Sequence, residues 1–438
     1  MLRSREREEI VGYLKKCAVE RVEENAPDGS AKVNQGPESQ PEIPTEQPIG
    51  TQTGLPPFPE AAWRGIFADY RKAMERATEA SDAFHFAALW ARSAVALGRC
   101  VHFSYGMPLY PNVYLVCFGP TGDKKTTATR MAADIGSAFK IVRGGGSGEG
   151  LADEFSTVEP GRGFLLYAEE FSQILRPGRW EGATLIPFLT ECFDCPPRYE
   201  KKFRKKPVTL EQPTPNFLTC ATPEWFWQDF RANDFLGGYG NRLFFLAGAR
   251  KPAMPLPEPA RLAAISHAVD TLASVKPREA RLDAKATALW EEFYRAWDAE
   301  DSRRDPLLLA AVKRIPPYAL KLAMTYSALE GTLPEITFDQ LTAAILVGRY
   351  GEVCAKELLS LQNVGINPRK ELERRILALV GAAPNKMMTK REIYRRLWRH
   401  YPDAEAFNRA FDSLVRAGEL FIKHAGHGSV WVSTESLD

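Results

Sequence analysis

The chain has 438 residues, of which 45% are hydrophobic and 26% are charged, and its formal net charge is only +2. These values predict a soluble globular protein of two or three domains and exclude a polycation, so any surface for nucleic acid must come from local clusters of Lys and Arg. The charged start, MLRSREREEI, lacks the apolar segment of a signal peptide, and no apolar run reaches membrane-spanning length, so we expect neither feature.

The cysteines indicate a reducing environment. Most of the seven are isolated in apolar segments, as expected of free thiols, so we expect a cytoplasmic protein. Cys192 and Cys195 form one CxxC pair. With no second pair at zinc spacing, a structural zinc site is not favoured.

The first 57 residues differ from the rest of the chain. Residues 1–25 are predicted to form a charged helix, which would suit a tether or a docking element for a protein partner. Residues 26–57 are rich in Pro, Gln, Gly and Glu and poor in large apolar side chains. Such a segment buries too little surface to offset its ordering entropy, so we interpret it as a flexible linker.

The next segments predict an α/β fold. Residues 58–110 read as helices, with Ser81 as an N-cap. Residues 111–256 alternate short apolar runs with helices and polar loops, which indicates a parallel sheet of about five strands. These runs are NVYLVCF, FKIV, GFLLYA, NFLTCAT and RLFFLAG.

The remaining chain is predicted to contain two further parts. Residues 257–363 are mostly helical, with Ala/Leu periodicity. Residues 369–434 read as three helices followed by a β-hairpin. That order, at that size, is typical of a winged helix-turn-helix.

A glycine loop follows the first apolar run, in the stretch LVCFGPTGDKKTTATR. The pattern G-x-x-x-x-G-K-[ST] cradles nucleotide phosphates at the start of a helix. Gly119, Lys125 and Thr126 match it, but Lys124 stands where the second glycine belongs. The strand-loop-helix context favours a phosphate-binding loop over a chance match. The predicted nucleotide-binding residues are Gly119, Gly122, Lys124, Lys125, Thr126 and Thr127.

An acidic pair ends a later strand, in GFLLYAEEF. Nucleotide hydrolysis needs a carboxylate on the magnesium side and a base that activates water. Glu169 and Glu170 offer both, because adjacent side chains diverge. The simpler interpretation is a solvated strand end, and the order of loop and acidic pair favours function.

Two basic features follow. Six of the ten residues in RYEKKFRKKP, Arg198 to Pro207, are Lys or Arg, with Tyr199 and Phe203 between them. A hairpin here would suit a phosphate backbone and stacking on single-stranded bases, and the alternative is a solvated loop. Arg242 precedes an apolar strand; it is either a surface ion-pair residue or an arginine finger that acts on a neighbouring subunit.

Together these motifs resemble the AAA+ helicases of phages and mobile genetic elements, which are akin to the MCM-like replicative helicases. The resemblance covers about residues 58–363. PNVYLVCFGPTGDKKTTATR looks like that family's phosphate loop, LLYAEEFSQIL like its Walker B segment and GGYGNRLFF like its arginine-finger motif. GGGSGEGLADEF and KLAMTYSALEG also look like family segments, the latter from a helical lid.

The resemblance implies a role for each matching residue. ATP and Mg²⁺ would be the cofactors, with Thr126 and Glu169 on the metal side. The implied catalytic residues are Glu170 as base, Thr222 as sensor 1 and Arg242 as a finger in trans. Arg314 is a weaker candidate for sensor 2. The expected DNA contacts are Arg198, Lys201, Lys202, Arg204, Lys205 and Lys206, with Arg409 and Lys423 in the winged helix, beside Asn408, Arg416, His424 and His427.

The sequence thus predicts an ATP-dependent DNA helicase or translocase. It would act as a homo-oligomeric ring, expected to be hexameric, in the replication of a phage or mobile genetic element. An ATP-gated loader or regulatory ATPase without strong unwinding is the first alternative, and a non-hydrolysing structural DNA binder is another. Glu169 in place of the usual Asp leaves the rate of turnover open.

Overall fold

A computed structural model describes most of the chain from residue 55 onward. The described residues are 55–133, 135–136, 139–144, 147–176, 184–202, 207–363, 368–381, 383, 386–398, 404–426 and 429–434. The expected N-terminal helix, and the expected linker up to residue 54, therefore lie outside the described residues. The described chain divides into two compact units, of which the first comprises residues up to 221 and 232–355, and the second 222–231 and 356–434.

A five-stranded parallel sheet forms the centre of the first unit. Its order is β4-β5-β8-β3-β9, and the strands are β3 (Tyr114–Phe118), β4 (Ile141–Arg143), β5 (Gly163–Ala168), β8 (Thr214–Ala221) and β9 (Phe244–Leu246). All pairings are parallel. The three central strands are buried along their whole length, as expected when helices cover both faces. The α/β prediction of about five strands is confirmed.

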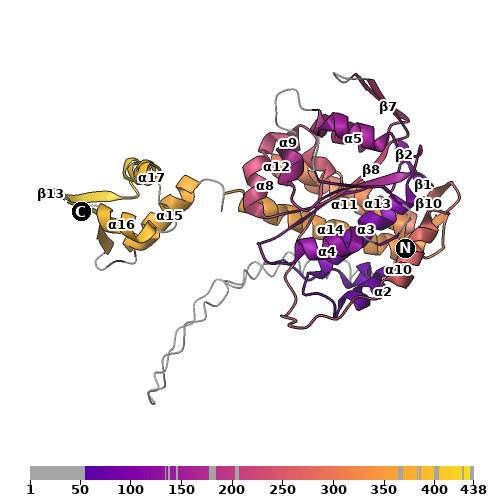
Figure 1. Ribbon diagram of the computed structural model, residues 1–438, viewed down its shortest axis with the longest axis horizontal. Coiled ribbons are helices and arrows are strands. Elements are labelled where there is room, and N and C mark those ends of the chain that lie inside the picture. Colours follow the sequence, from indigo (N-terminus) through magenta and orange to yellow (C-terminus); the bar gives the residue numbers. More distant parts are fainter. Residues whose placement is uncertain are drawn as a thin grey trace, which may run out of the picture. The chain divides into compact units, whose positions relative to one another are not determined.

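Helices cover the two faces of this sheet. In Figure 1, α3 (Asp82–Leu97) and α4 (Lys125–Ala133) lie on one side of β8, and α5 (Gly148–Phe155) lies on the other. The helix α7 (Leu185–Cys192) packs beside α5 and against β8. Nearly every residue of α3 is buried, and Ser81 caps it by accepting a hydrogen bond from the backbone N–H of Ala83.

A second, mixed sheet was not predicted. Its order is β11-β10-β1-β2, with the strands β1 (Val101–Tyr105), β2 (Met107–Leu109), β10 (Arg278–Leu282) and β11 (Glu335–Ile336). Residues 58–110 contain β1 and β2 besides the expected helices, whereas residues 257–363 are mostly helical as expected, with β10 and β11 added. The parallel pairing of β1 with β10 joins these two segments.

The first unit also contains other helices. They are η1 (Glu60–Ala62), α2 (Ile66–Met74), α6 (Ser172–Leu175), α9 (Ala232–Leu236), η3 (Gly240–Arg242), α10 (Ala263–Leu272), α11 (Ala284–Asp301), α12 (Pro306–Val312) and α13 (Ile315–Leu329). The helix α14 (Phe338–Ser360) begins in the first unit and ends in the second. The strands β6 (Arg198–Lys202) and β7 (Pro207–Glu211) pair as an antiparallel two-stranded sheet.

The second unit contains a small helical module with its own sheet. Its elements are α8 (Pro223–Asp229), η4 (Leu361–Asn363), α15 (Pro368–Gly381), β12 (Met387–Thr389), α16 (Lys390–Leu397), α17 (Ala404–Arg416), β13 (Phe421–Gly426) and β14 (Ser429–Ser433). The helix-helix-helix-hairpin order agrees with the sequence, and β12 adds an unpredicted third strand in the order β12-β14-β13. Twelve buried apolar side chains from all three helices and from the strands form its core.

Candidate nucleotide site

The glycine loop joins the buried strand β3 directly to α4, which begins at Lys125. Gly122 has a φ of 98° and Lys124 a φ of 56°. Both values lie in the left-handed region, which disfavours residues other than glycine, so the usual pattern has glycine at the position of Lys124 for a physical reason. Lys124 is exposed. At Lys124 the loop therefore adopts a backbone conformation that glycine adopts most easily.

Lys125 lies inside the loop and is almost fully buried. Its Nζ donates hydrogen bonds to the carbonyl oxygens of Gly119, at 2.7 Å, and Pro120, at 2.6 Å. Burial lowers the pKa of Lys125, and the nearby negative charges of Asp123 and Glu170 oppose that fall. The ammonium group is thus held at the point of the loop where a phosphate-binding lysine is needed.

The hydroxyl residues of α4 divide by environment. Thr126 is partly buried in the first turn, and Thr127 is exposed. Thr129, which the sequence analysis did not select, is buried and donates to the carbonyl oxygens of Lys125 and Thr126. Its Oγ1 also lies 3.2 Å from the hydroxyl of Tyr167 on β5. Thr129 thereby fixes α4 against the central sheet.

The acidic pair follows the end of β5, two strands from the glycine loop. Adjacent strands lie about 4.8 Å apart, so the two strand ends are separated by about 10 Å along the same edge of the sheet. Ligands in parallel α/β sheets bind at this carboxyl edge. Burial raises the pKa of Glu170, and the positive charge of Lys125 opposes the rise. A carboxylate with a raised pKa is a better base at neutral pH.

Glu169 has a partner that the sequence did not indicate. Its Oε1 accepts hydrogen bonds from Arg130 on α4, at 2.6 Å from Nη2 and 3.1 Å from Nε. The two side chains are 41% and 58% exposed. Glu169 is therefore paired with a cation one helical turn beyond Thr126.

A second pair lies beside the loop. Arg250 follows β9 and forms an ion pair with Glu79. Its positive charge also opposes the rise in the pKa of Asp123 that burial causes. The pKa of Glu79 is lowered mainly by a hydrogen bond from the backbone N–H of Met254, and further by Arg250 and Lys124. Sequence reasoning missed Arg250 and Glu79, because no motif connects them with the loop.

The two arginines expected to sense nucleotide meet away from the loop. Arg242 Nη2 lies 2.7 Å from Asp194 Oδ2, and Arg314 Nη1 lies 2.6 Å from Asp194 Oδ1. Both guanidinium groups also lie over the ring of Phe193. Arg242 precedes β9, so it lies at the amino edge of the parallel sheet, opposite the loop. Arg314, the sensor-2 candidate, is thus paired with Asp194, and its nucleotide-binding role stays a prediction.

A buried lysine lies in the same cluster. Lys321 donates hydrogen bonds of 2.7 Å to both the backbone and the side-chain oxygen of Asn112, and its Nζ lies 4.4 Å from the centre of the Phe193 ring. Burial lowers its pKa to about 7. Lys321 thus tolerates burial through two acceptors and an aromatic face.

The basic stretch forms the predicted hairpin in part. Arg198, Lys201 and Lys202 lie on β6, whereas Phe203, Arg204, Lys205 and Lys206 lie outside the described residues. Arg198 pairs with Glu200 and Glu211. Tyr199 needs a correction as a stacking residue, because it is 1% exposed and packs against Phe188 with ring centroids 5.1 Å apart.

Thr222 has a structural role in the second unit. It follows the last residue of β8 and caps α8, accepting a hydrogen bond of 3.3 Å from the backbone N–H of Trp225. This bond does not exclude the sensor role implied by the resemblance. Helix capping alone, however, is enough to explain why a threonine stands at this position.

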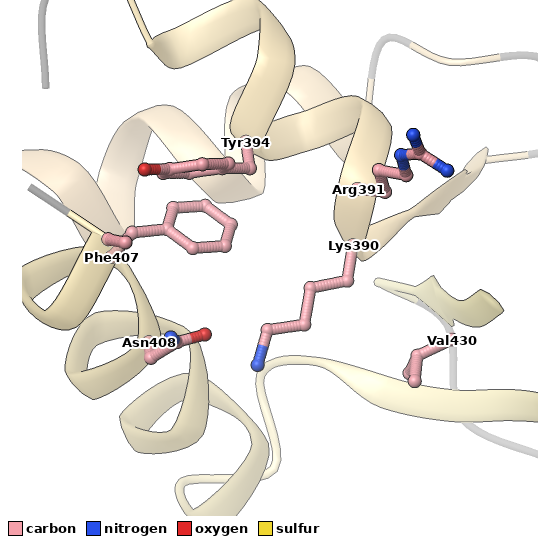
Figure 2. Close-up of a pocket in the computed structure, with 7 residues that line it drawn as sticks. Lys390, Arg391, Tyr394, Phe407, Asn408 and Val430 are labelled. Carbon is pink, nitrogen blue, oxygen red and sulfur yellow. The ribbon is translucent and has the colours of Figure 1, made fainter. Parts of the chain in front are cut away.

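The DNA-binding candidates of the C-terminal module lie on α17 and β13. Arg409 is exposed and lies 3.7 Å from Glu405. Asn408 lines a pocket between α16 and α17, beside Lys390 and Tyr394 (Figure 2). Arg416 is exposed, and Lys423 on β13 is partly buried. His427 lies outside the described residues, as does the side chain of His424.

Within the described ranges, no three His, Cys, Asp or Glu side chains are grouped to hold a metal ion. Magnesium at phosphates usually takes only one or two protein ligands, and Thr126 and the strand-end glutamates are the residues present for such a site. The described cysteines are free. None of the described helices has the length and apolarity needed to cross a membrane.

No protein-family model matches the chain, and no curated protein matches it either.

Proposed function

We propose that the protein is a Mg-ATP-dependent DNA translocase of the AAA+ class, with a helical lid and a C-terminal winged helix. It would act as a ring of identical subunits, expected to be a hexamer, in replication of a phage or mobile genetic element. The observation that carries the proposal is the shared carboxyl edge of β3 and β5, which bears a lysine-containing phosphate loop and a glutamate with a raised pKa.

Hydrolysis is supported by the complementary environments of two residues. Lys125 is preorganised at the start of α4, where backbone N–H groups and the helix dipole favour phosphate. Glu170 is desolvated and electrostatically coupled to Lys125. Phosphate would take over the hydrogen bonds that Lys125 now gives to the loop carbonyls, and Glu170 would orient and deprotonate the attacking water.

An oligomer is supported by the position of Arg242. A residue at the amino edge of the sheet cannot reach a phosphate at the carboxyl edge of its own subunit. A neighbouring subunit that presents its loop to this edge would meet Arg242 and Arg314 together. Asp194 would then have to exchange these guanidinium groups for the phosphate of the neighbour.

Binding to DNA is supported by the charge of the β6–β7 hairpin and of the C-terminal module. Lys201 and Lys202 lie on a strand whose partner contributes one acidic residue, Glu211. The burial of Tyr199 means that this strand would contact the phosphate backbone rather than stack on bases.

One observation favours a second function, an ATP-gated loader or regulatory ATPase. The ion pair between Glu169 and Arg130 occupies the carboxylate that would approach the metal. If this pair persisted with nucleotide bound, ATP would be held and turned over slowly.

A mixing experiment tests the shared active site. Arg242→Ala and Glu170→Gln should each bind ATP and each fail to hydrolyse it. Mixed together, they form some interfaces with one intact loop and one intact arginine, so activity should reappear at intermediate ratios. Arg242→Lys controls for the packing of Arg242 against Asp194. Absence of activity at every ratio, with both variants folded and oligomeric, would refute the shared site.

A further inference from the structure

The C-terminal module carries its excess positive charge on α16 rather than on α17. The sequence of α16, Lys390–Leu397, contains four basic residues and one acidic residue, a net charge of +3. Along α17, Ala404–Arg416, two basic and two acidic residues cancel. The helix that the sequence analysis selected for DNA is therefore electrically neutral.

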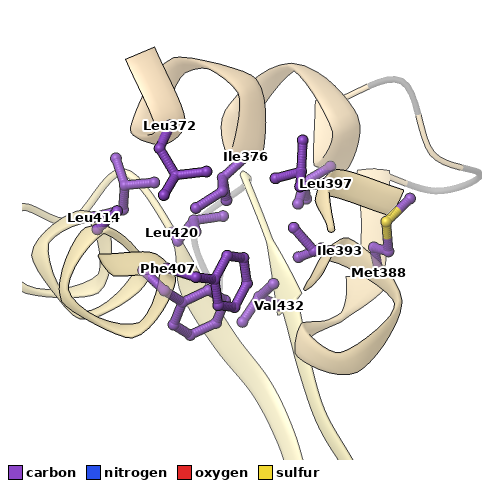
Figure 3. Close-up of a cluster of buried hydrophobic side chains, with 12 residues drawn as sticks. Leu372, Ile376, Met388, Ile393, Leu397, Phe407, Leu414, Leu420 and Val432 are labelled. Atoms are coloured by element: carbon purple, nitrogen blue, oxygen red, sulfur yellow. The ribbon is translucent and has the colours of Figure 1, made fainter. Parts of the chain in front are cut away.

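The packing of α16 fixes which of its residues face solvent. Thr389 caps the helix by accepting a hydrogen bond from the backbone N–H of Glu392. Ile393 and Leu397 point into the apolar core of the module (Figure 3). Arg391 and Arg395, at helical spacings of two residues from Ile393, are consequently exposed, and Trp398 at the helix end is 50% exposed.

The exposed cations of α16 are poorly neutralised. Arg396 pairs with Glu392 at 3.0 Å. Lys390 lies 3.8 Å from Asp412 and 4.3 Å from the centre of the Phe411 ring. In the part of the chain that the structure describes, no carboxylate forms an ion pair with Arg391 or Arg395. A surface with unneutralised guanidinium groups attracts a polyanion.

Aromatic side chains lie among these cations. Tyr394 contacts Trp398 with ring centroids 5.2 Å apart and Phe407 with centroids 4.9 Å apart. Tyr394 and Phe407 line a pocket of about 240 Å³ whose other walls include Lys390, Arg391 and Asn408. In Figure 2 the ammonium group of Lys390 and the amide of Asn408 point toward each other across this pocket. Cations interleaved with aromatic rings are typical of surfaces that bind single-stranded nucleic acid.

We propose that the outer face of α16 and the adjoining pocket bind the phosphate backbone of a single-stranded nucleic acid, with Trp398 stacking on a base. The arginines would contact successive phosphates, and the α16–α17 pocket would receive a phosphate or a base edge next to Lys390 and Asn408. The choice of ligand rests on the proposed function, but the surface is independent of the nucleotide site. An acidic protein is the competing partner for a basic face.

Binding of a fluorescent 20-nucleotide strand to the full chain without ATP tests the proposal. We expect Arg391→Gln/Arg395→Gln to weaken binding at low salt and to reduce the slope of log affinity against log salt by about 1.4, or about 0.7 for each lost phosphate contact. The matched control, Arg281→Gln/Arg295→Gln on β10 and α11 of the first unit, removes the same charge from two exposed side chains and should change the slope little. Trp398→Ala should weaken binding about fivefold or more, the usual loss for one stacked base.

Photocrosslinking locates the contact even if other surfaces also bind the strand. A 5-iodouracil strand should crosslink to the peptide that contains Tyr394 and Trp398. Equal slopes for the two double variants, or crosslinks only in other peptides, would overturn the proposal, as would equal competition by polyglutamate. ATP hydrolysis by the same preparations separates the two proposals. If the wild type does not hydrolyse ATP, the proposed translocase is refuted, while the proposed binding surface on α16 is unaffected.

Discussion

The backbone at Lys124 makes a quantitative prediction, because this residue has a φ of 56° where the common pattern has glycine. A left-handed conformation costs a residue other than glycine about 1 to 2 kcal/mol. Glycine avoids this cost but loses about 0.5 to 1 kcal/mol through its greater freedom in the unfolded chain. We therefore expect Lys124→Gly to raise the free energy of unfolding by about 0 to 1.5 kcal/mol, whereas an average substitution lowers it by about 1 kcal/mol.

Urea unfolding of the full chain, followed by circular dichroism, measures this difference. Lys124→Ala keeps the left-handed strain and should be close to the wild type. Lys124→Val adds β-branching and should be less stable by about 1 kcal/mol. Because Lys125 holds the phosphate position, Lys124→Gly should also retain ATP binding. A loss of more than about 1 kcal/mol in the glycine variant, relative to alanine, would refute the strained-loop explanation.

Three further predictions concern buried or paired groups. Since burial lowers the folded pKa of Lys321 to about 7, the unfolded chain holds more protons between pH 7 and about 10.4, and this residue should make stability rise with pH there by up to about 1.4 kcal/mol per pH unit. The free energy of unfolding should therefore rise less between pH 7 and pH 9 in Lys321→Met than in the wild type, and equal rises would contradict the lowered pKa. Tyr199→Phe should leave stability unchanged, because the buried Tyr199 hydroxyl has no hydrogen-bond partner among the described residues. Tyr199→Ala should lose about 3 to 5 kcal/mol of stability in thermal or urea unfolding, and full stability of this variant would mean that Tyr199 is a surface residue. Arg130→Ala should change the free energy of unfolding by under about 1 kcal/mol, as for exposed ion pairs, and by releasing Glu169 it should lower the Mg²⁺ concentration for half-maximal ATPase by up to about fivefold. Arg130→Lys is the control, and an unchanged Mg²⁺ concentration in Arg130→Ala would place Glu169 away from the metal.

The parallel sheet was predictable from sequence because each of its strands includes a short run of apolar residues. The mixed sheet was not predictable, since β1 and β10 are partly exposed strands with polar residues. These two strands pair with each other although they lie nearly 180 residues apart in the sequence. The glycine loop and the acidic pair carry local motifs. The pairing of Glu169 with Arg130, and of Arg242 and Arg314 with Asp194, depends on tertiary contacts that leave no local pattern.

The charge of α16 could have been predicted from its sequence, KREIYRRL. The winged-helix pattern favours the third helix, α17, for DNA contacts, and the sequence alone does not show which cations have acidic partners. Only the folded module shows that α17 carries as many acidic as basic residues on one element, and that Arg391 and Arg395 face solvent.

The central claim is that Lys125 and Glu170 belong to one site that hydrolyses ATP and responds to DNA. Steady-state phosphate release with Mg-ATP, measured with and without single-stranded DNA, tests it most directly. The account predicts hydrolysis that DNA stimulates in the wild type, no ATP binding in Lys125→Ala, and binding without turnover in Glu170→Gln. Hydrolysis by Lys125→Ala at the rate of the wild type would contradict it.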